Sequence, residues 1–145
     1  MRSKIFSASA AILAPAFLLG SGLGSAAAAP LDVAIEGVEA RGGTLFVSVQ
    51  TEAQFMGDDW VAGERVEGPT DGTLRLTLDV PPGDYAVTVW HDDDGDGAFT
   101  MAPTGMPLDG WAMSGNPRGM PSFGAAKVEV DEAGGATSMT MTYGR

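Results

Sequence analysis

Residues 81–97 read PPGDYAVTVWHDDDGDG, so a turn, a strand and an acidic loop follow one another without a gap. Pro81–Gly83 forms the turn, because proline presets a backbone angle that turns use and glycine tolerates a positive φ. In Tyr85–His91 the apolar side chains at every second position indicate a half-buried β-strand. Four aspartates and two glycines then follow at 92–97. The stretch therefore predicts a β scaffold that presents carboxylates at one end.

The same strand-like alternation recurs on both sides of this stretch. We expect strands at residues 31–38, 45–50, 73–80, 127–130 and 137–143, and a short edge strand at 60–66. Arg41–Gly43 supplies a turn between the first two strands, which we expect to pair as a hairpin. Short strands, regular turn signals and no helical period beyond the N-terminal residues predict an all-β fold. The expected architecture is an antiparallel β-sandwich of about seven strands, immunoglobulin-like or transthyretin-like.

Two residues of the central strand are expected to anchor the fold. Tyr85 follows the proline-rich turn in the pattern Gly-x-Tyr, which resembles a tyrosine corner, where a buried phenol hydrogen-bonds backbone near the turn. His91 is the only histidine of the chain. If it faces inward with Tyr85, we expect it to bond the backbone of the following loop and so hold the acidic turn to that loop.

Residues 99–123 show neither a strand period nor a helix period, which is unusual in a compact domain unless the loop has a task. We expect one long ordered loop, packed over one end of the sandwich beside the acidic turn. Candidates for anchoring this loop or lining a ligand surface are His91, Trp111, Phe123 and Tyr85. An exposed Trp111 beside the acidic turn would favour a ligand such as a sugar.

The N-terminal residues have the features of a secretory signal peptide. Arg2 and Lys4 give a positive start, an apolar run follows, and small residues at 25–29 offer a cleavage site. The strongly apolar part is shorter than the roughly 20 residues that span a bilayer, and no charged stop-transfer flank follows it. These features favour export over membrane anchoring.

The expected domain organisation follows from this reading. Residues 1–29 form the signal peptide, cut after Ala28 or Ala29, and residues 30–145 form one β-sandwich domain. We expect the mature protein in the periplasm or outside the cell, without a membrane span and as a monomer.

Charge and cysteine content exclude several classes of partner and site. Removing the signal peptide takes away Arg2 and Lys4 but no acid, so the formal net charge of -11 becomes -13. A chain this acidic is not expected to bind nucleic acid or anionic membranes, which attract lysine and arginine. The chain has no cysteine, which excludes disulfides, thiol catalysis and thiolate metal sites.

The acidic turn suggests a cation site. Asp92, Asp94 and Asp96, followed by Gly97, have the spacing of the first half of an EF-hand loop, in which alternate carboxylates bind Ca²⁺. The second half of that pattern is missing, so we expect weak binding, completed by Asp109 from the long loop. The alternative is a solvated turn in which the aspartates cap backbone amides.

The sequence favours a catalytic site or a copper site less than it favours a Ca²⁺ site. A serine-histidine-aspartate set would need His91 with Ser114 or Ser122, and neither serine lies in a nucleophile-elbow motif. We therefore expect no enzyme activity. A copper site would combine His91 with thioethers. The available methionines are Met101, Met106, Met113 and Met120. Their spacing favours gap-filling under the loop instead.

Five separated motifs occur in order along the chain, at Gly83–Val87, His91–Gly97, Gly105–Pro107, Gly110–Ser114 and Pro121–Phe123. In their composition and order they resemble the DUF2141 family of exported bacterial proteins. The resemblance is close in the C-terminal half of the chain and implies export and a sandwich fold, with no known activity. Together these readings predict an exported binding or structural module of the cell envelope with an unidentified envelope or extracellular ligand. The alternative is a periplasmic protein that binds Ca²⁺ or, as the weaker option, copper.

Overall fold

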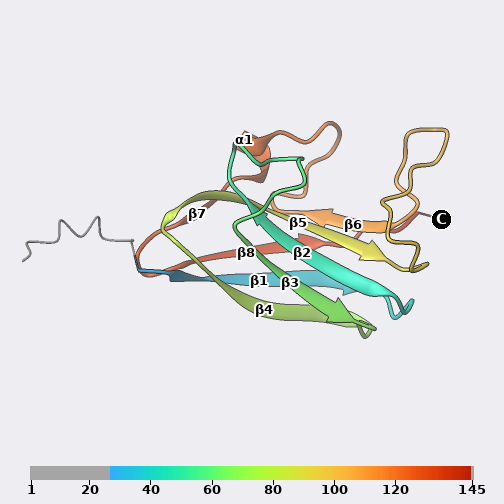
Figure 1. Cartoon of the computed structure of the whole chain (residues 1–145), viewed down its shortest axis with the longest axis horizontal. Coiled ribbons are helices and arrows are strands. Elements are labelled where there is room, and N and C mark those ends of the chain that lie inside the picture. Colours follow the sequence, from blue (N-terminus) through green and yellow to red (C-terminus); the bar gives the residue numbers. More distant parts are fainter. Residues whose placement is uncertain (1–26, 145) are drawn as a thin grey trace, which may run out of the picture.

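The computed structural model describes residues 27–144 (Figure 1). The expected signal peptide lies almost entirely outside these residues. The first strand, β1 (Ala29–Val38), begins one residue before the expected domain boundary at Pro30. Ala29 is buried and lies opposite Val80 of the neighbouring strand.

The fold is an all-β sandwich of two sheets, which confirms the predicted class. One sheet has three strands in the order β4-β1-β8, with β4 at Gly72–Val80 and β8 at Gly135–Thr140. Strands β1 and β4 are antiparallel, whereas β1 and β8 are parallel (Figure 1). The parallel pair departs from the all-antiparallel arrangement that the sequence led us to expect.

The second sheet has five strands, in the order β3-β2-β5-β6 with β7 paired to the start of β5. Its strands are β2 (Thr44–Gln50), β3 (Ala62–Glu67), β5 (Gly83–Asp92), β6 (Gly110–Met113) and β7 (Val128–Val130). All pairings within this sheet are antiparallel. The edge strand expected near residues 60–66 is confirmed as β3.

The expected hairpin of the first two strands is wrong, because β1 and β2 belong to different sheets. The turn at 39–43 carries the chain from one layer to the other. Alternation reveals which side chains of a strand face inward, but any strand with an inward apolar face satisfies it equally well. The choice of partner strand therefore depends on the whole sandwich.

The core lies between the sheets and is built by the inward residues that the alternation indicated. Fully buried side chains from both layers meet there, and they include Leu31, Ile35, Leu45, Val49, Val87 and Met139. Tyr85 is buried, and its hydroxyl donates to the Pro81 carbonyl, so the predicted tyrosine corner is confirmed. Burial also raises the pKa of this phenol.

Residues 99–123 are not one loop, which corrects the expectation. Strand β6 divides them, pairing with the end of β5 so that Trp111 lies opposite Trp90. A short helix, α1 (Phe123–Ala126), then begins after Ser122, whose side chain accepts the Ala125 N–H as a cap. The four residues of β6 are too few to show a period. Among the described residues, no helix has the length and apolar character to cross a membrane.

Candidate functional site

The end of the sandwich where β5 stops is held by a buried histidine. His91 is 0% exposed, and its Nε2 lies 2.7 Å from the Gly42 carbonyl oxygen. A carbonyl only accepts, so Nε2 carries a proton and donates. The other ring nitrogen, Nδ1, lies 2.9 Å from the Tyr143 hydroxyl. In the neutral ring Nδ1 therefore accepts from Tyr143, and both nitrogens are satisfied.

Tyr143 connects this histidine to the turn after β1. Its hydroxyl oxygen accepts the Glu39 N–H at 3.0 Å while donating to His91. Burial raises the pKa of the Tyr143 phenol, and the bond from Glu39 offsets only part of this effect. The hydroxyl is therefore a proton donor at neutral pH. The sequence predicted an anchor at His91 but the wrong partner, because the ring binds the β1–β2 turn and not the loop that follows it.

Gly43 brings that turn directly against the acidic turn. Its φ is +65°, in the region that favours glycine, and a Cβ atom at this position would overlap the Asp92 carbonyl oxygen. Arg41 of the same turn pairs with Glu39 at 2.6 Å and with Asp93 at 3.3 Å. The β1–β2 turn is thus packed onto the chain that leaves β5.

The acidic turn is organised by its own aspartates. Asp92 is buried and accepts the N–H groups of Asp96 at 3.2 Å and Gly97 at 2.9 Å. Asp94 also accepts from Asp96, at 3.1 Å, and Asp96 accepts from Ala98 at 2.9 Å. These are the capping bonds that the solvated-turn reading predicted.

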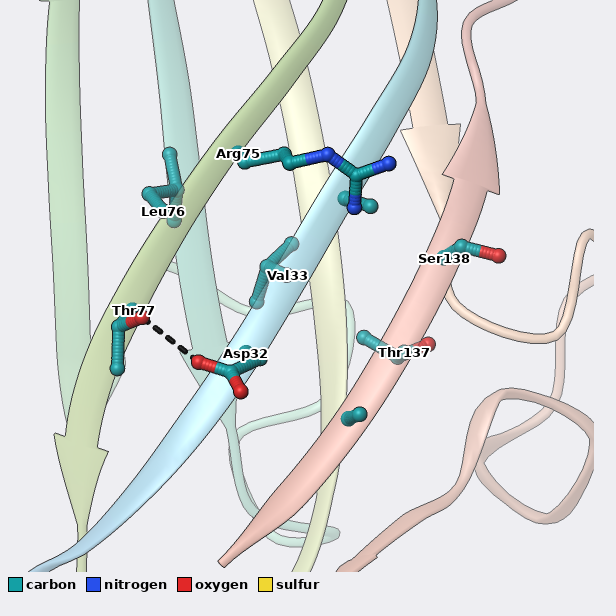
Figure 2. Close-up of a pocket in the computed structure, with 9 residues that line it drawn as sticks. Asp32, Val33, Arg75, Leu76, Thr77, Thr137 and Ser138 are labelled. Carbon is teal, nitrogen blue, oxygen red and sulfur yellow. Dashed lines mark hydrogen bonds between the residues drawn. The ribbon is translucent and has the colours of Figure 1, made fainter.

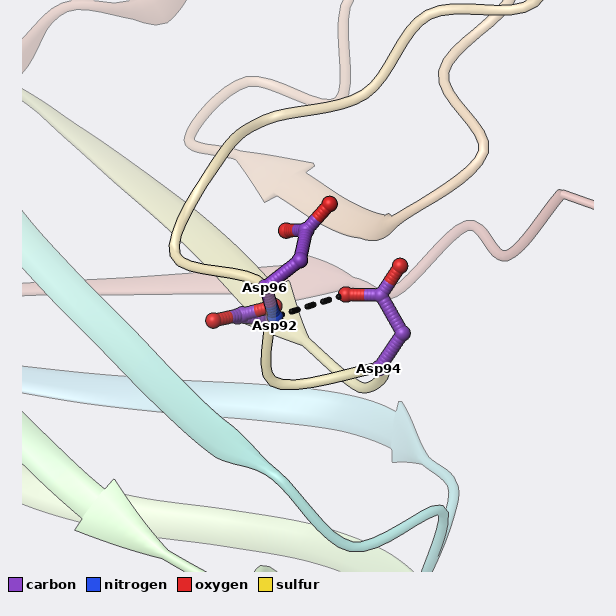
Figure 3. Close-up of side chains that lie close together, drawn as sticks. All are labelled: Asp92, Asp94 and Asp96. Carbon is purple, nitrogen blue, oxygen red and sulfur yellow. Dashed lines mark hydrogen bonds between the residues drawn. The ribbon is translucent and has the colours of Figure 1, made fainter.

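The same residues have the geometry of a cation site. Asp92, Asp94 and Asp96 each offer a carboxylate oxygen, and these oxygens lie within 4.8 Å of one another (Figure 3). The pKa of Asp94 is raised above its ordinary value. The Asp96 N–H lowers this pKa, but desolvation and the neighbouring carboxylates outweigh it. A bound cation would relieve that repulsion.

Asp109 lies next to this group without belonging to it. The side chain is 2% exposed, and Oδ2 accepts the Trp90 indole N–H and the Thr100 N–H, each at 3.0 Å. The hydroxyl of Thr100 donates to Asp96 at 3.3 Å. Thr100 therefore connects Asp109 to the acidic turn, and the expected fourth ligand serves as an acceptor for the loop backbone.

An apolar pocket of about 310 Å³ lies between the β5–β6 loop (residues 93–109) and the C-terminal residues, and it neighbours the acidic turn through Thr100, which bonds both Leu108 and Asp96. The β5–β6 loop forms one wall, and β6 with the C-terminal residues forms the other. The lining residues that matter most are Met106, Leu108, Trp111 and Tyr143. Trp111, singled out from the sequence, is half-buried and is the one candidate surface residue that lines this pocket. Met106 was considered only as a copper ligand or gap-filling residue and Leu108 was not singled out, because nothing in the sequence pairs the loop with the C-terminal residues.

The other candidate residues lie elsewhere or are enclosed. Phe123 packs edge to face on Phe55, with ring centroids 5.8 Å apart, near α1. Ser114 is buried, donating to the Ala126 carbonyl and accepting the Val87 N–H. Neither Ser114 nor the capping Ser122 bonds His91.

The methionines considered for copper are spread over several surroundings. Met113 is buried in a small cluster that packs under α1, whereas Met120 is exposed in the loop before α1. Met101 and Met106 belong to the β5–β6 loop and are exposed. Both nitrogens of His91 are already bonded in the interior, so the ring presents no free ligand to a copper ion.

A second hollow, of about 620 Å³, lies on the outer face of the three-stranded sheet. Arg75 reaches from β4 across β1, and Thr77 donates to Asp32 at 2.7 Å (Figure 2). Ser138 of β8 lines the opposite side. This polar, open face shares no residue with the acidic end.

The chain was also compared with known protein families. A family described as "Uncharacterized protein conserved in bacteria (DUF2141)" matches residues 33–138, well over half of the chain. The chain belongs to the DUF2141 family. The DUF2141 match contains the acidic turn and the whole β5–β6 loop, whereas Tyr143 lies beyond it. No protein of curated function and no solved structure matches the chain.

Proposed function

We propose that this protein is an exported, monomeric binding module of the cell envelope without catalytic activity, and that the β5–β6 loop carries its ligand surface. The observation behind this proposal is a group of four large apolar side chains in one loop, each between 46% and 60% exposed. They are Phe99, Met101, Met106 and Leu108. Single exposed apolar residues are ordinary, but four in one short loop, of which Met106 and Leu108 line the same pocket, favour an interaction surface.

The support beneath this loop suits a binding surface. His91, Gly43 and Tyr143 hold the end of β5 through buried contacts, so the loop rises from a fixed base. Binding residues on loops work best when a rigid scaffold positions them. The absence of a free histidine nitrogen at this end favours binding over acid-base catalysis.

Site-specific photo-crosslinking in the producing cell tests the binding surface. A photoreactive amino acid at Met106 or Leu108 should form adducts with an envelope component. The same substitution at Met120, which is exposed at the other end of β6, is the matched control. Adducts from all three positions alike, or from none, would contradict a ligand surface on the β5–β6 loop.

The intact mass of the mature protein tests export and the position of signal-peptide cleavage. Cleavage after Ala28 leaves Ala29 at the start of β1, where it is buried opposite Val80, whereas cleavage after Ala29 removes a core residue. We therefore expect an intact mass for the mature protein that begins at Ala29. A full-length chain recovered from the cytoplasm would contradict export.

A second candidate function is Ca²⁺ binding, favoured by the three carboxylate oxygens that lie within 4.8 Å of one another. Oxygen ligands at alternate positions around a glycine suit a hard cation. Asp109 is not one of these three ligands and would support the site only through Thr100.

Thermal unfolding of the mature domain tests the calcium site. Ca²⁺ at ~100 times its dissociation constant should add about 2.7 kcal/mol, a rise of several degrees in Tm. The measurement compares EGTA with millimolar Ca²⁺ and uses Mg²⁺ as the control ion. The rise should vanish in Asp94→Ala. Equal Tm values in EGTA and Ca²⁺ would leave the turn a solvated one.

A further inference from the structure

The pocket beside the acidic turn has a wall that backbone hydrogen bonds hold in place. The Ala102 N–H donates to the Met106 carbonyl at 2.8 Å, which closes the tip of the β5–β6 loop. The Leu108 N–H donates to the Thr100 carbonyl at 2.9 Å, which ties the base of the loop together. Met106 and Leu108 therefore lie on a small hairpin whose two arms are joined by backbone hydrogen bonds.

The opposite wall is equally fixed. Trp111 and Thr142 exchange two backbone hydrogen bonds, of 2.9 Å and 2.8 Å, which join the C-terminal residues to β6. Gly144 lies so close to the Pro107 carbonyl oxygen that a Cβ atom would stand 2.8 Å from it. The loop and the C-terminal residues meet across the pocket, and a ligand would find both walls already formed. Such preorganisation reduces the entropy lost on binding.

Size limits what the pocket can take. Its volume of about 310 Å³ lies at the lower end of the roughly 300–1,000 Å³ of small-molecule sites. One large apolar side chain fits such a space. Met106 is 60% exposed and Leu108 48% exposed at its rim, so apolar surface continues outside the pocket.

The charged side chains of the acidic turn and the β5–β6 loop are all negative. No lysine or arginine occurs between Arg75 and Arg118 in the sequence, a range that contains the acidic turn and the entire loop. Within residues 27–144, no lysine or arginine forms an ion pair with Asp94 or Asp96. Among the described residues at this end, Arg41 lies over the Tyr143 ring, 4.3 Å from its centroid, and is already paired with Glu39 and Asp93.

One residue links the carboxylates to the apolar wall. Thr100 donates its hydroxyl to Asp96 at 3.3 Å, and its carbonyl accepts the Leu108 N–H at 2.9 Å. Thr100 alone therefore separates the Leu108 backbone from the Asp96 carboxylate, which no described lysine or arginine pairs with. Cationic groups on either side of a side chain in the pocket would complement this carboxylate.

We propose that this pocket receives one apolar side chain from a positively charged segment of a protein partner. The inference rests on the proposed binding function and names the partner class. Apolar insertion provides the anchor, and the carboxylates of the acidic turn select flanking lysine or arginine side chains.

Aromatic contacts at this end argue against a sugar as the occupant. Trp90 stacks on Phe46 with centroids 5.0 Å apart, and its indole N–H is taken by Asp109. Trp111 is half-buried in the pocket wall. Sugar stacking needs a free ring face; Phe46 covers one face of Trp90, and Phe99 packs against the same indole with centroids 6.3 Å apart. The exposed groups of the loop are mostly aliphatic, thioether and carboxylate groups, and its one exposed aromatic ring, that of Phe99, packs edge to face on Trp90.

Peptide titration followed by NMR on the mature domain tests the proposal. The probe is the blocked peptide KKLKK, with KKGKK and EELEE as matched controls that lack the anchor or reverse the charge. We expect KKLKK to shift the Met106 methyl, Leu108 and Trp111 indole signals and to bind about tenfold more tightly than either control. Equal binding of KKGKK would remove the apolar anchor from the proposal, and equal binding of EELEE would remove the charge selection. Either result overturns it.

Two substitutions on exposed loops keep the test independent of folding. Met106→Ser, which removes apolar surface at the rim without adding charge, should weaken KKLKK binding about tenfold, whereas Met120→Ser, at a methionine that is 94% exposed, should leave it unchanged. An Asp94→Asn, Asp96→Asn double variant should reduce both the affinity and its salt dependence. If KKLKK causes no shifts while photo-crosslinks still form at Met106, the binding surface stands and its cationic partner is rejected. If both fail, both proposals are rejected.

Discussion

Two neighbouring regions at the end of β5 find hydrogen-bond partners for their polar side chains in opposite ways. His91 is satisfied by Gly42 and Tyr143, which are 49 and 52 residues away in sequence. In the acidic turn, which starts at the next residue, Asp92, Asp94 and Asp96 accept N–H groups only two to five residues away. The first region is closed to solvent and joins three parts of the chain, whereas the second closes on itself and leaves Asp94 and Asp96 exposed.

The region around His91 therefore supports the site, whereas the acidic turn carries the charged groups of the site. A buried polar group without partners is costly, so the histidine anchor requires every one of its contacts. An exposed turn held by local bonds tolerates a change of charge or ligand, because water substitutes for a lost partner. Substitutions in the two regions should therefore differ in size and even in sign.

The largest effect should come from Gly43→Ala, where the two regions touch. The new methyl group would overlap the Asp92 carbonyl oxygen, and the positive φ would strain an alanine. We expect a loss of about 3–5 kcal/mol in the free energy of unfolding, measured in urea. Gly42→Ala is the matched control, because its φ is also positive but the space around it is open. The control should lose only about 1–2 kcal/mol, and similar losses would show that the close packing is unimportant.

Removing the imidazole should have the next largest effect. His91→Leu fills a similar space but leaves the Gly42 carbonyl and the Tyr143 hydroxyl without their partner, so we expect a loss of about 2–4 kcal/mol. Chemical denaturation measures it. A neutral result would mean that the anchor acts by packing alone.

Tyr143→Phe should cost less, about 1–2 kcal/mol, because it removes one hydroxyl and leaves the ring in place. The double variant His91→Leu, Tyr143→Phe should lose less than the sum of the two single losses, since each variant breaks the same bond. Full additivity would show that the two residues act separately. Tyr85→Phe, which breaks a bond to Pro81 only, is the control that should add independently.

The smallest effect should come from the acidic turn, with the opposite sign. The pKa of Asp94 is raised in the folded protein, so its contribution to stability is present at low pH and is lost as the pH rises through that pKa. Asp94→Asn should therefore give a slightly higher Tm than the native chain in EGTA at neutral pH. The difference should disappear in acid. A lower Tm for the variant at neutral pH would mean that the charge stabilises the turn.

The sequence alone determined the features that depend on local chemistry, namely the inward faces of the strands, the tyrosine corner and the acidic turn. The alternation of Leu31, Leu45 and Val87 identified the inward faces, because side chains of a strand point to opposite sides with a period of two. The tyrosine corner at Tyr85 and the aspartate spacing of the acidic turn were visible in the sequence because their hydrogen-bond partners lie only a few residues away.

The tertiary structure alone decided which strands pair and which distant residues meet. The parallel pair β1–β8, the bond from His91 to Gly42 and the pocket between Leu108 and the C-terminus all join segments far apart in the chain. Several pairings would bury the same inward faces, so the hydrophobic pattern does not choose among them. The choice comes from packing the whole sandwich at once, and it places an apolar pocket beside the acidic turn.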